Sequence, residues 1–586
     1  MSTSGGSIDG LMSASASRDT MVESPTRTAA PTPRVGISVN PVVAAVLVAA
    51  TLAILYGIVL RVWLLVELPI WGDEAIVGIM ARAIDGGHFT AFYWGQHYGG
   101  LEPYLVALGL KVGGGGEPAL NGTPALICAL GAALVGVLTF ATTRNRPLAL
   151  AASGAVWVWP YVVIWQSVRE GGFREATLCC GLAALICCVR VYRRRAGPGT
   201  LLALGAVLGL GWWASPEIGY FALPCLVLLS AWWWAVSGTR ASAGQGGAEK
   251  EPSRLAAFGL VVAGGLVGSL PWLYANAHTG FASIKSGSLP ANGGATYGER
   301  LSVFFHFMLP LQLGVRTVSS GAWVGGPAVG KLLYAVVLVL IAAACARAVW
   351  VAVGERSTVV PAALAAGVVT YPFLYAAAPG TAFWFDGRYG IYFPALAVAL
   401  FAASLGTLHR KAPRPDDRSG TVARGALVIA AAGVVGALCL TVAGARTAGV
   451  PAGFFTSWRQ GDAPMEQVVH ALRLHHITDA YGDYWTAYDL DFLSGGSPAI
   501  SPSPLDVVRS TGLATQVGSA EDPAWLFFAP DEAAQAGAVF GNPQPGPGPY
   551  TEQTFEAHLA ALGIPYKVVK LGIMDAVLPD RRPPGL

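Results

Sequence analysis

Long apolar runs separated by short polar segments dominate the first three quarters of the chain. They occupy residues 41–60, 121–143, 147–165, 174–192, 200–214, 216–236, 255–275, 329–350, 358–376, 389–408 and 425–445. A helix of about 20 apolar residues spans the hydrocarbon core of a bilayer. The pattern therefore predicts an all-α polytopic membrane protein with about eleven transmembrane helices.

Basic residues gather in alternate loops between these runs, for example Arg144 with Arg146 and Arg193 with Arg195. Because cytoplasmic loops carry the excess of Lys and Arg, we expect a cytoplasmic N-terminus and an extracytoplasmic C-terminus. Two long polar loops, 66–120 and 276–328, then face outward. Within the first, Leu101 to Val112 is too short to cross a bilayer and fits a helix lying along the outer surface.

The two ends of the chain differ from this pattern. Residues 1–38 are rich in Ser, Thr, Ala and Pro, which predicts a disordered cytoplasmic tail. The run that follows is too long for a signal peptide and lacks a cleavage site, so we expect a retained helix at the start of a membrane domain, 39–446. Residues 447–586 show soluble patterning and predict a small extracytoplasmic α/β domain, with helices near 465–474 and 555–562 and strands near 524–528 and 566–569.

The composition agrees with a membrane protein and excludes several other classes. Hydrophobic residues make up 54% of the chain and charged residues only 12%, about half the charged fraction of a soluble domain. A net charge of +3 with no extended basic run gives no reason to expect a nucleic-acid partner. All eight cysteines lie in apolar runs, without the spacing of a metal site or a disulfide framework.

An acidic pair, Asp73 and Glu74, follows Trp71-Gly72 shortly after the first apolar run, and Gly95-Gln96-His97-Tyr98-Gly99-Gly100-Leu101-Glu102 follows in the same loop. Two more polar motifs are expected on the outward side: Trp213 to Phe221, containing Glu217, and Asp386-Gly387-Arg388-Tyr389. In this order the motifs resemble the GT-C superfamily of polyprenyl-phosphate-sugar glycosyltransferases. The likeness is to the bacterial branch that is similar to protein O-mannosyltransferases and lipid A aminoarabinose transferases, and it covers roughly the first 410 residues.

The resemblance implies an enzyme of a bacterial cell membrane that moves a sugar from a polyprenyl-phosphate carrier to an acceptor on the outer face. The acceptor can be an envelope lipid, a glycan or a protein. An inverting transfer needs a carboxylate to take the proton of the acceptor hydroxyl, and Asp73 is the candidate. Glu74 is expected to support the site by a hydrogen bond or by holding a divalent metal with Asp73. The alternative for the pair is the capped start of an amphipathic helix.

The leaving group would be a lipid phosphate, which calls for a guanidinium at the membrane surface. Arg388, next to Tyr389 at the outward end of an apolar run, is the first candidate. Arg61 is a second candidate, or else an arginine that reaches toward the lipid headgroups. In the turn 166–175 the resemblance suggests Glu170 opposite the first-loop acid and Arg169 or Arg174 for phosphate, although these charges could instead neutralise one another.

The remaining candidates each have a structural alternative. Glu102 could orient sugar hydroxyls or cap the surface helix, and Gln96 and His97 could bind sugar or serve only the loop. Glu217 could belong to the site or be a hydrated acid at an outward turn. The aromatic and acidic stretch Tyr481 to Tyr488 could bind carbohydrate or form a buried strand-to-helix junction.

Two other functions fit a polytopic chain. A transporter or lipid flippase would place ionisable residues at mid-membrane and commonly show internal repeats, whereas the apolar runs here are nearly free of charge and show no repeat. A non-catalytic envelope assembly protein would have no need for Asp73 and Arg388. The pattern therefore favours the glycosyltransferase.

Overall fold

The computed structural model describes residues 40–70, 72–193, 196–239, 253–285, 295–318, 320–354, 359–410, 417–449, 463–530, 532 and 546–586. The predicted N-terminal tail, 1–38, and Trp71 lie outside these ranges. The tail therefore stays a prediction.

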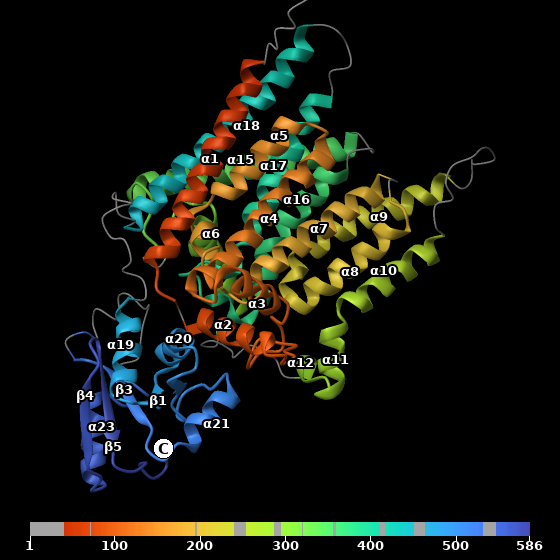
Figure 1. Ribbon diagram of the computed structural model, residues 1–586. Helices are drawn as coiled ribbons and strands as arrows, with labels where there is room; N and C mark the ends of the chain where they lie inside the picture. The colour runs from red at the N-terminus through yellow and green to blue at the C-terminus, as the bar shows by residue number, and fades with distance from the viewer. Residues whose placement is uncertain are drawn as a thin grey trace, which may run out of the picture. The chain divides into compact units, whose positions relative to one another are not determined.

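Every predicted apolar run coincides with helical structure (Figure 1). Seven of the runs are formed by long helices that are continuous over most of the run: α1 (Pro41–Glu67), α4 (Glu117–Thr143), α7 (Arg174–Tyr192), α15 (Gly326–Gly354), α16 (Val359–Ala377), α17 (Tyr392–Arg410) and α18 (Asp417–Thr447). The others are shorter or broken: α5 (Arg146–Val158) with α6 (Tyr161–Gln166), α8 (Pro198–Ala214), η1 (Pro216–Phe221) with α9 (Ala222–Thr239), and α10 (Arg254–Gly268) with α11 (Leu270–His278).

By length and apolar composition, eight helical segments among the described residues could cross a membrane, or nine if α10 and α11, bent by 63°, form one span. The predicted number of about eleven also counted the runs of α5 and α8, which have 13 and 17 residues. Prolines explain the breaks. Helix α5 ends before Pro160, whose ring disfavours helical backbone at Trp159, and Pro271 stands at the start of α11.

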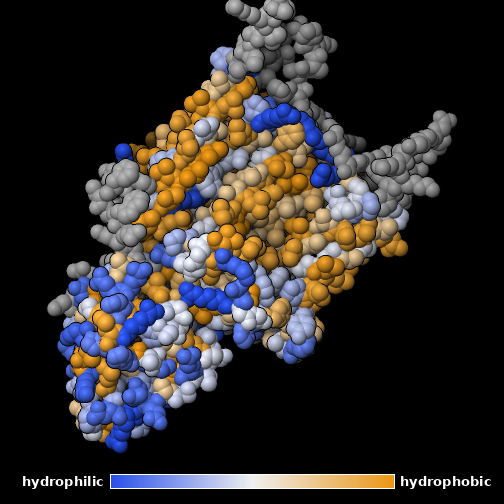
Figure 2. Space-filling model, viewed as in Figure 1, coloured by the Kyte–Doolittle hydropathy of each residue, from blue (hydrophilic) through white to orange (hydrophobic). Residues whose placement is uncertain are grey.

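Helices α8 and α10 lie side by side and meet through glycines (Figure 1). A Cβ atom on Gly205 would lie 2.0 Å from the carbonyl oxygen of Val261, and one on Gly264 would lie 2.1 Å from that of Leu202. Small residues allow this backbone approach, which is characteristic of helix packing within membranes. On the face shown in Figure 2, hydrophobic residues cover much of the helical part, and exposed apolar side chains of α1 and α10 such as Leu52, Leu55 and Phe258 suit contact with lipid.

Short helices connect the long ones. They are α2 (Gly72–Asp85), α3 (Glu102–Gly113), α12 (Ala282–Lys285), α13 (Tyr297–Val303), the π-helical turn η2 (Phe304–Met308), α14 (Leu309–Gln312), η3 (Pro379–Ala382) and η4 (Arg388–Gly390). Helix α2 begins directly before Asp73 and Glu74, whose charges are favoured in the first turn of a helix. Helix α3 coincides with the helix predicted at 101–112, displaced by one residue.

The C-terminal region, residues 463–586, forms a five-stranded sheet in the order β2-β1-β3-β5-β4. Its strands are β1 (Asp479–Gly482), β2 (Ala499–Pro502), β3 (Ala524–Phe528), β4 (Tyr566–Lys570) and β5 (Met574–Pro579), and its helices are α19 (Ala463–Leu474), α20 (Tyr484–Ser494), α21 (Thr511–Ser519) and α23 (Glu552–Ala561). Strand β1 pairs in parallel with β2 and β3, whereas β5 is antiparallel to β3 and β4. The predicted helices and strands of this region are confirmed.

Helix α20 packs against α2, so the loop 66–120 and the C-terminal region share an apolar cluster. Ile76 and Met80 of α2 contribute to it together with Tyr488 and Phe492 of α20. Arg82 of α2 donates to the carbonyl oxygen of Phe492 at 2.6 Å and lies over its ring. This contact brings the C-terminal region next to the acidic pair.

Candidate active site

The adjacent acids at the start of α2 point in different directions. Successive residues of a helix are rotated by about 100°, and this rotation places Asp73 in one environment and Glu74 in another. The Asp73 side chain is 32% exposed, whereas that of Glu74 is 4% exposed. The two carboxylates therefore belong to separate contact groups.

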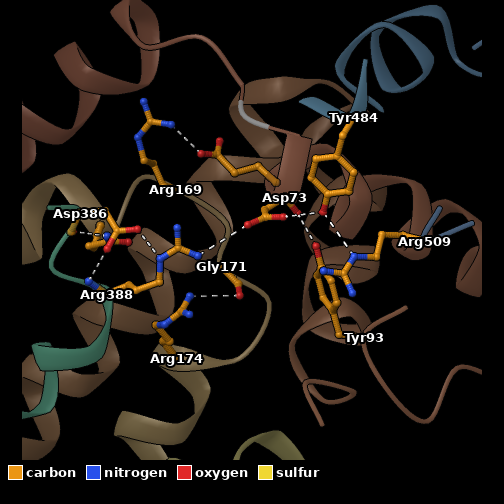
Figure 3. Close-up of polar contacts among 11 residues, drawn as sticks. Asp73, Tyr93, Arg169, Gly171, Arg174, Asp386, Arg388, Tyr484 and Arg509 are labelled. Atoms are coloured by element: carbon orange, nitrogen blue, oxygen red, sulfur yellow. Dashed lines mark hydrogen bonds and ion pairs between the residues drawn. The ribbon is translucent and has the colours of Figure 1, made fainter. Parts of the chain in front are cut away.

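The first group, called here the Asp73 group, consists of Asp73, Arg388 and Tyr484 (Figure 3). Oδ2 of Asp73 lies 3.6 Å from Nη1 of Arg388, and Oδ1 accepts a hydrogen bond of 3.0 Å from the hydroxyl of Tyr484. The backbone carbonyl of Asp73 accepts from the hydroxyl of Tyr93 at 3.2 Å. The Asp73 carboxylate thus lies between a cation of the membrane helices and a phenol of the C-terminal region.

Arg388 is held by the turn that precedes α17. The carboxylate of Asp386, 3% exposed, accepts from the backbone N–H of Arg388 at 3.0 Å and from its Nε. Gly387 between them has φ +74°, and a Cβ atom there would lie 2.3 Å from Val162, so only glycine suits this turn. The turn leaves Nη1 of Arg388 facing Asp73.

A second cation, a carboxylate and two aromatic rings lie near Arg388. The guanidinium of Arg174 lies 5.6 Å from the ring centre of Tyr389, and its Nη1 donates to the carbonyl oxygen of Gly171 at 3.4 Å. Glu217 interacts electrostatically with both Arg174 and Arg388 and accepts a hydrogen bond from the hydroxyl of Tyr392. The structure therefore places three of the predicted residues, Arg174, Tyr389 and Glu217, beside Arg388.

The second group, called here the Glu74 group, consists of Glu74, Arg169 and Asn121. Oε1 of Glu74 pairs with Nη1 of Arg169 at 2.8 Å, and Oε2 accepts from the Asn121 amide at 2.8 Å. Arg169 is only 6% exposed and lies over the ring of Trp165. The predicted phosphate role of Arg169 is therefore not favoured by its position, because Glu74 already binds it inside the protein.

Two further predicted acids are buried and hydrogen-bond near the start of α7 rather than to Asp73. Glu170 accepts from the backbone N–H of Gly172 at 2.7 Å, and Glu102 accepts from that of Ala176 at 3.3 Å. Glu102 thus caps the first turn of α7 instead of its own helix. Burial, reinforced by neighbouring carboxylates, raises the pKa of both Glu102 and Glu170 well above the ordinary value.

Arg61 lies inside the helix bundle, 2% exposed. Its Nε donates to the Ser167 hydroxyl at 2.8 Å and its Nη1 to two backbone carbonyls at 3.1 Å, while its guanidinium covers the ring of Trp157 at 3.6 Å. This position corrects the alternative that Arg61 extends to the lipid headgroups. Neutral acceptors satisfy the hydrogen bonds of the buried Arg61 guanidinium, so its position gives no support to a role in phosphate binding.

Gln96 and His97 lie in the turn that joins Tyr93 to Tyr98. The backbone N–H of Gln96 donates to the carbonyl of Tyr93, and the ring of His97 meets that of Phe92 edge to face, with centroids 6.0 Å apart. The preceding residue, Gly95, accepts a hydrogen bond of 3.1 Å from Nη1 of Arg509. Arg509 also contacts Tyr484, so it connects the loop of Gln96 and His97 to the Asp73 group.

Sequence reasoning missed Asn121 and Arg509, and it gave Tyr484 no specific role. The stretch around Tyr484 is a strand-to-helix junction, as one alternative held, because β1 ends at Gly482 and the Asp483 carboxylate caps α20. Burial raises the pKa of Asp483 to about 6. No local pattern could reveal that Tyr484 contacts a residue 411 positions earlier.

The acidic pair does not fit a shared metal ion. Each carboxylate already has a guanidinium beside it, and the two point apart. In the part of the chain that the structure describes, no group of three or more His, Cys, Asp or Glu side chains is placed to hold a metal. We therefore assign no step to a metal.

Comparison with known proteins identifies a shared fold. No protein-family model matches the chain, and no curated protein matches it. The crystal structure of ArnT from Cupriavidus metallidurans bound to undecaprenyl phosphate matches with a TM-score of 0.52 and 15% identity over 91% of this chain and 97% of that chain. Its apo form matches with a TM-score of 0.52 and 14% identity over 92% and 98%.

An Archaeoglobus fulgidus oligosaccharyltransferase in complex with Zn and sulfate matches with a TM-score of 0.44 and 14% identity, over 84% of this chain and 69% of that chain. ArnT and the oligosaccharyltransferase are both members of the GT-C superfamily. The likeness to ArnT extends over nearly the whole of both chains, including the C-terminal region. The helices and the sheet of this chain therefore have the fold of ArnT.

Proposed function

We propose that the chain is an integral membrane glycosyltransferase that moves a sugar from a polyprenyl-phosphate carrier to an acceptor on the outer face of a bacterial cell membrane. The observation that carries the proposal is the partly exposed Asp73 carboxylate, which faces Arg388 at 3.6 Å. Arg388 is the first residue of a candidate span. The fold supports it, because ArnT with this fold was crystallised with undecaprenyl phosphate. Buried ion pairs alone would not support the proposal, since they occur in proteins of any function.

In the proposed reaction Asp73 takes the proton of the acceptor hydroxyl as its oxygen forms a bond to the anomeric carbon. The bond between that carbon and the phosphate oxygen breaks, and its electron pair leaves with the polyprenyl phosphate. Attack opposite the leaving group inverts the anomeric configuration. The protein therefore needs a base on one side of the sugar and positive charge on the other.

Arg388 supplies the positive charge in this scheme. Its Nε and backbone N–H are occupied by Asp386, so the guanidinium is oriented before substrate binds. Preorganised charge stabilises a leaving phosphate without the cost of reorienting it during the reaction. Arg174, beside Tyr389, is placed to assist, and Glu217 partly balances the two cations.

Domain organisation and orientation are part of the proposal. We infer a membrane domain, 39–446, and a region outside the bilayer, 447–586, because hydrophilic residues gather over the C-terminal region in Figure 2 while apolar ones cover the helices. The basic residues of alternate loops favour an extracytoplasmic side for this region. The acceptor is an envelope lipid, glycan or protein. The site then opens to the side where the acceptor is located.

The test is transfer of labelled sugar from a polyprenyl phosphate by the purified chain in proteoliposomes. Donor and acceptor are first identified by comparing lipid-linked sugars and envelope glycans of cells with and without the protein. We expect product with the wild type and about 10²- to 10⁴-fold slower transfer with Asp73→Asn. Asp85→Asn is the matched control, because Asp85 lies on the same helix and forms only an exposed pair with Lys111.

Movement of the intact lipid-linked sugar across the bilayer, without a new glycosidic bond, would show a flippase and contradict the proposal. Product formation by Asp73→Asn at the wild-type rate would contradict the role of Asp73 as base. Unchanged lipid-linked sugars and envelope glycans in cells that lack the protein would also contradict the proposal.

A further inference from the structure

The Asp73 carboxylate is held from two sides by distant parts of the chain (Figure 3). Arg388 of the membrane helices faces Oδ2, and the Tyr484 hydroxyl donates to Oδ1 at 3.0 Å. Tyr484 is the first residue of α20 and belongs to the C-terminal region. A residue from outside the membrane helices therefore binds the group assigned as the base.

The direction of this hydrogen bond is fixed by Arg509. Nε of Arg509 lies 3.4 Å from the Tyr484 hydroxyl, and its Nη1 donates to the carbonyl oxygen of Gly95 at 3.1 Å. A guanidinium can only donate, and a phenol has a single proton. Because Arg509 donates to the oxygen of Tyr484, the proton of Tyr484 is directed to Asp73, and the three groups form a chain of hydrogen bonds that polarise one another.

The chemistry of Tyr484 keeps it a donor. Burial, together with the nearby Asp73 carboxylate, raises the pKa of its phenol above the ordinary value. A phenol that stays protonated across the physiological range can donate to a carboxylate throughout turnover. Tyr484 is therefore suited to orient Asp73 and not to exchange protons with it.

Helix α20 is fastened to α2 at both of its ends, which fixes the position of Tyr484. At the start, the backbone of Trp485 packs so close to Gly72 that a Cβ atom there would lie 2.8 Å from its carbonyl oxygen. At the end, a Cβ atom on Gly78 would lie 2.4 Å from the ring of Phe492, and Arg82 donates to the carbonyl of that residue. Substituents at either glycine would push the two helices apart.

We propose that the C-terminal region completes the active site, with Tyr484, oriented by Arg509, as a positioning residue that holds the Asp73 carboxylate with Oδ2 toward Arg388. The inference rests on the proposed function only in taking Asp73 as the base. It gives the C-terminal region a direct part in turnover, beyond binding partners or covering the membrane helices. Arg388 and Arg174 would bind the donor from one side, while the C-terminal region orients the base from the other.

The first test compares Tyr484→Phe with Tyr481→Phe in the transfer assay. Tyr481 is a matched control, because it is a buried tyrosine of the same region whose hydroxyl also lies 3.4 Å from an arginine, Arg582. We expect Tyr484→Phe to lower kcat about 10- to 100-fold, the rate equivalent of one hydrogen bond to a charged group. The donor KM should stay within about twofold, because Tyr484 does not touch Arg388.

Tyr481→Phe should retain the wild-type kcat. A merely structural contribution of tyrosine hydroxyls would lower the kcat of both variants alike, or would change the midpoint of thermal unfolding of Tyr484→Phe in detergent. Either result would overturn the inference, as would a Tyr484→Phe variant with wild-type kcat.

A second test does not depend on the transfer reaction. A water-soluble carbodiimide modifies exposed carboxylates, and mass spectrometry measures the rate at Asp73. Loss of the hydrogen bond from Tyr484 makes the carboxylate more nucleophilic, so labelling of Asp73 should be faster in Tyr484→Phe than in the wild type and in Tyr481→Phe. Equal rates in all three proteins would refute the inference. A wild type that transfers no sugar, yet shows the faster labelling in Tyr484→Phe, would contradict the proposed function and leave the positioning of Asp73 intact.

Discussion

The Asp73 group and the Glu74 group start from adjacent residues of one helix and differ in almost every other respect. The ion pair of Asp73 with Arg388 is 3.6 Å long, and its side chains are 32% and 23% exposed. That of Glu74 with Arg169 is 2.8 Å long, with side chains 4% and 6% exposed. A short, enclosed pair is closed to a substrate, whereas the longer pair has side chains that are exposed to solvent. The comparison separates a site that can react from a site that holds α2 in place.

The largest expected effect comes from the accessible group. Asp73→Asn removes the proposed base and should reduce transfer about 10²- to 10⁴-fold, the usual contribution of general base catalysis. Its folding should change little, because the side chain is partly exposed and the amide oxygen of asparagine can still accept from Tyr484. Transfer rate and thermal unfolding in detergent, measured against Asp85→Asn, check both parts. Loss of folding in Asp73→Asn would remove the contrast between the groups.

The Glu74 group should respond in the opposite way. Glu74→Gln leaves the buried Arg169 guanidinium without its carboxylate, and removal of one partner of a buried pair costs about 3–5 kcal/mol. We expect a clearly lower unfolding midpoint but nearly normal transfer per folded molecule. The double variant Glu74→Gln with Arg169→Met should recover part of the loss, because it removes the buried charge as well. A stable Glu74→Gln that transfers no sugar would instead place Glu74 in the chemistry.

The fold was predictable from the sequence because its main signals are local. Apolar runs of about 20 residues predict membrane helices by length alone, and the C-terminal elements follow from short-range patterning. The number of spans was harder to predict. The breaks at Pro160 and Pro271 divide runs that look continuous in composition, and hydropathy does not distinguish one bent helix from two short ones.

The site was predictable only where residues form motifs. Asp73 and Arg388 could be singled out because each stands in a polar motif next to an apolar run, and the structure brings them together. Contacts could not be read from residue type: Arg169 and Arg174 are equally buried, yet Arg169 pairs with Glu74 whereas Arg174 lies beside Tyr389. Arg509 lies in no motif, and its contact with Gly95 depends on how the C-terminal region packs against the loop 66–120.

Arg388→Lys tests whether the accessible pair recognises phosphate by shape as well as by charge. Lysine keeps the charge but cannot bind two oxygens at once or keep the contact with Asp386 in the same geometry. We expect kcat/KM for the donor to fall about 10- to 100-fold, equivalent to about 1.4–2.7 kcal/mol, mainly through a higher KM. Arg316→Lys is a suitable control, because Arg316 lies over the ring of Trp323 in the second long loop, 276–328. Equal losses in both variants would argue against a phosphate site at Arg388.

The smallest effect is expected for Glu170, a buried acid whose pKa burial raises. An acid whose pKa is higher in the folded state than in the unfolded state binds its proton more tightly when folded. Its contribution to the free energy of unfolding is therefore greatest at low pH and declines as pH rises above the ordinary glutamate value near 4.5. Glutamine imitates the protonated acid, so Glu170→Gln should leave the free energy of unfolding at acidic pH within about 1 kcal/mol of the wild type.

As pH rises toward neutrality, Glu170→Gln should become equal to or slightly more stable than the wild type, because it has no proton to lose. Thermal unfolding in detergent at several pH values between about 4.5 and 8 measures this difference. Glu74→Gln measured in parallel is the contrast, since its carboxylate faces Arg169 and its loss should destabilise the fold at neutral pH. If Glu170→Gln instead loses stability at neutral pH as Glu74→Gln does, the Glu170 carboxylate is charged in the folded protein and is stabilised by cations around the turn. Glu170 would then belong with Glu74 among the paired acids, and burial alone would no longer explain the difference between them.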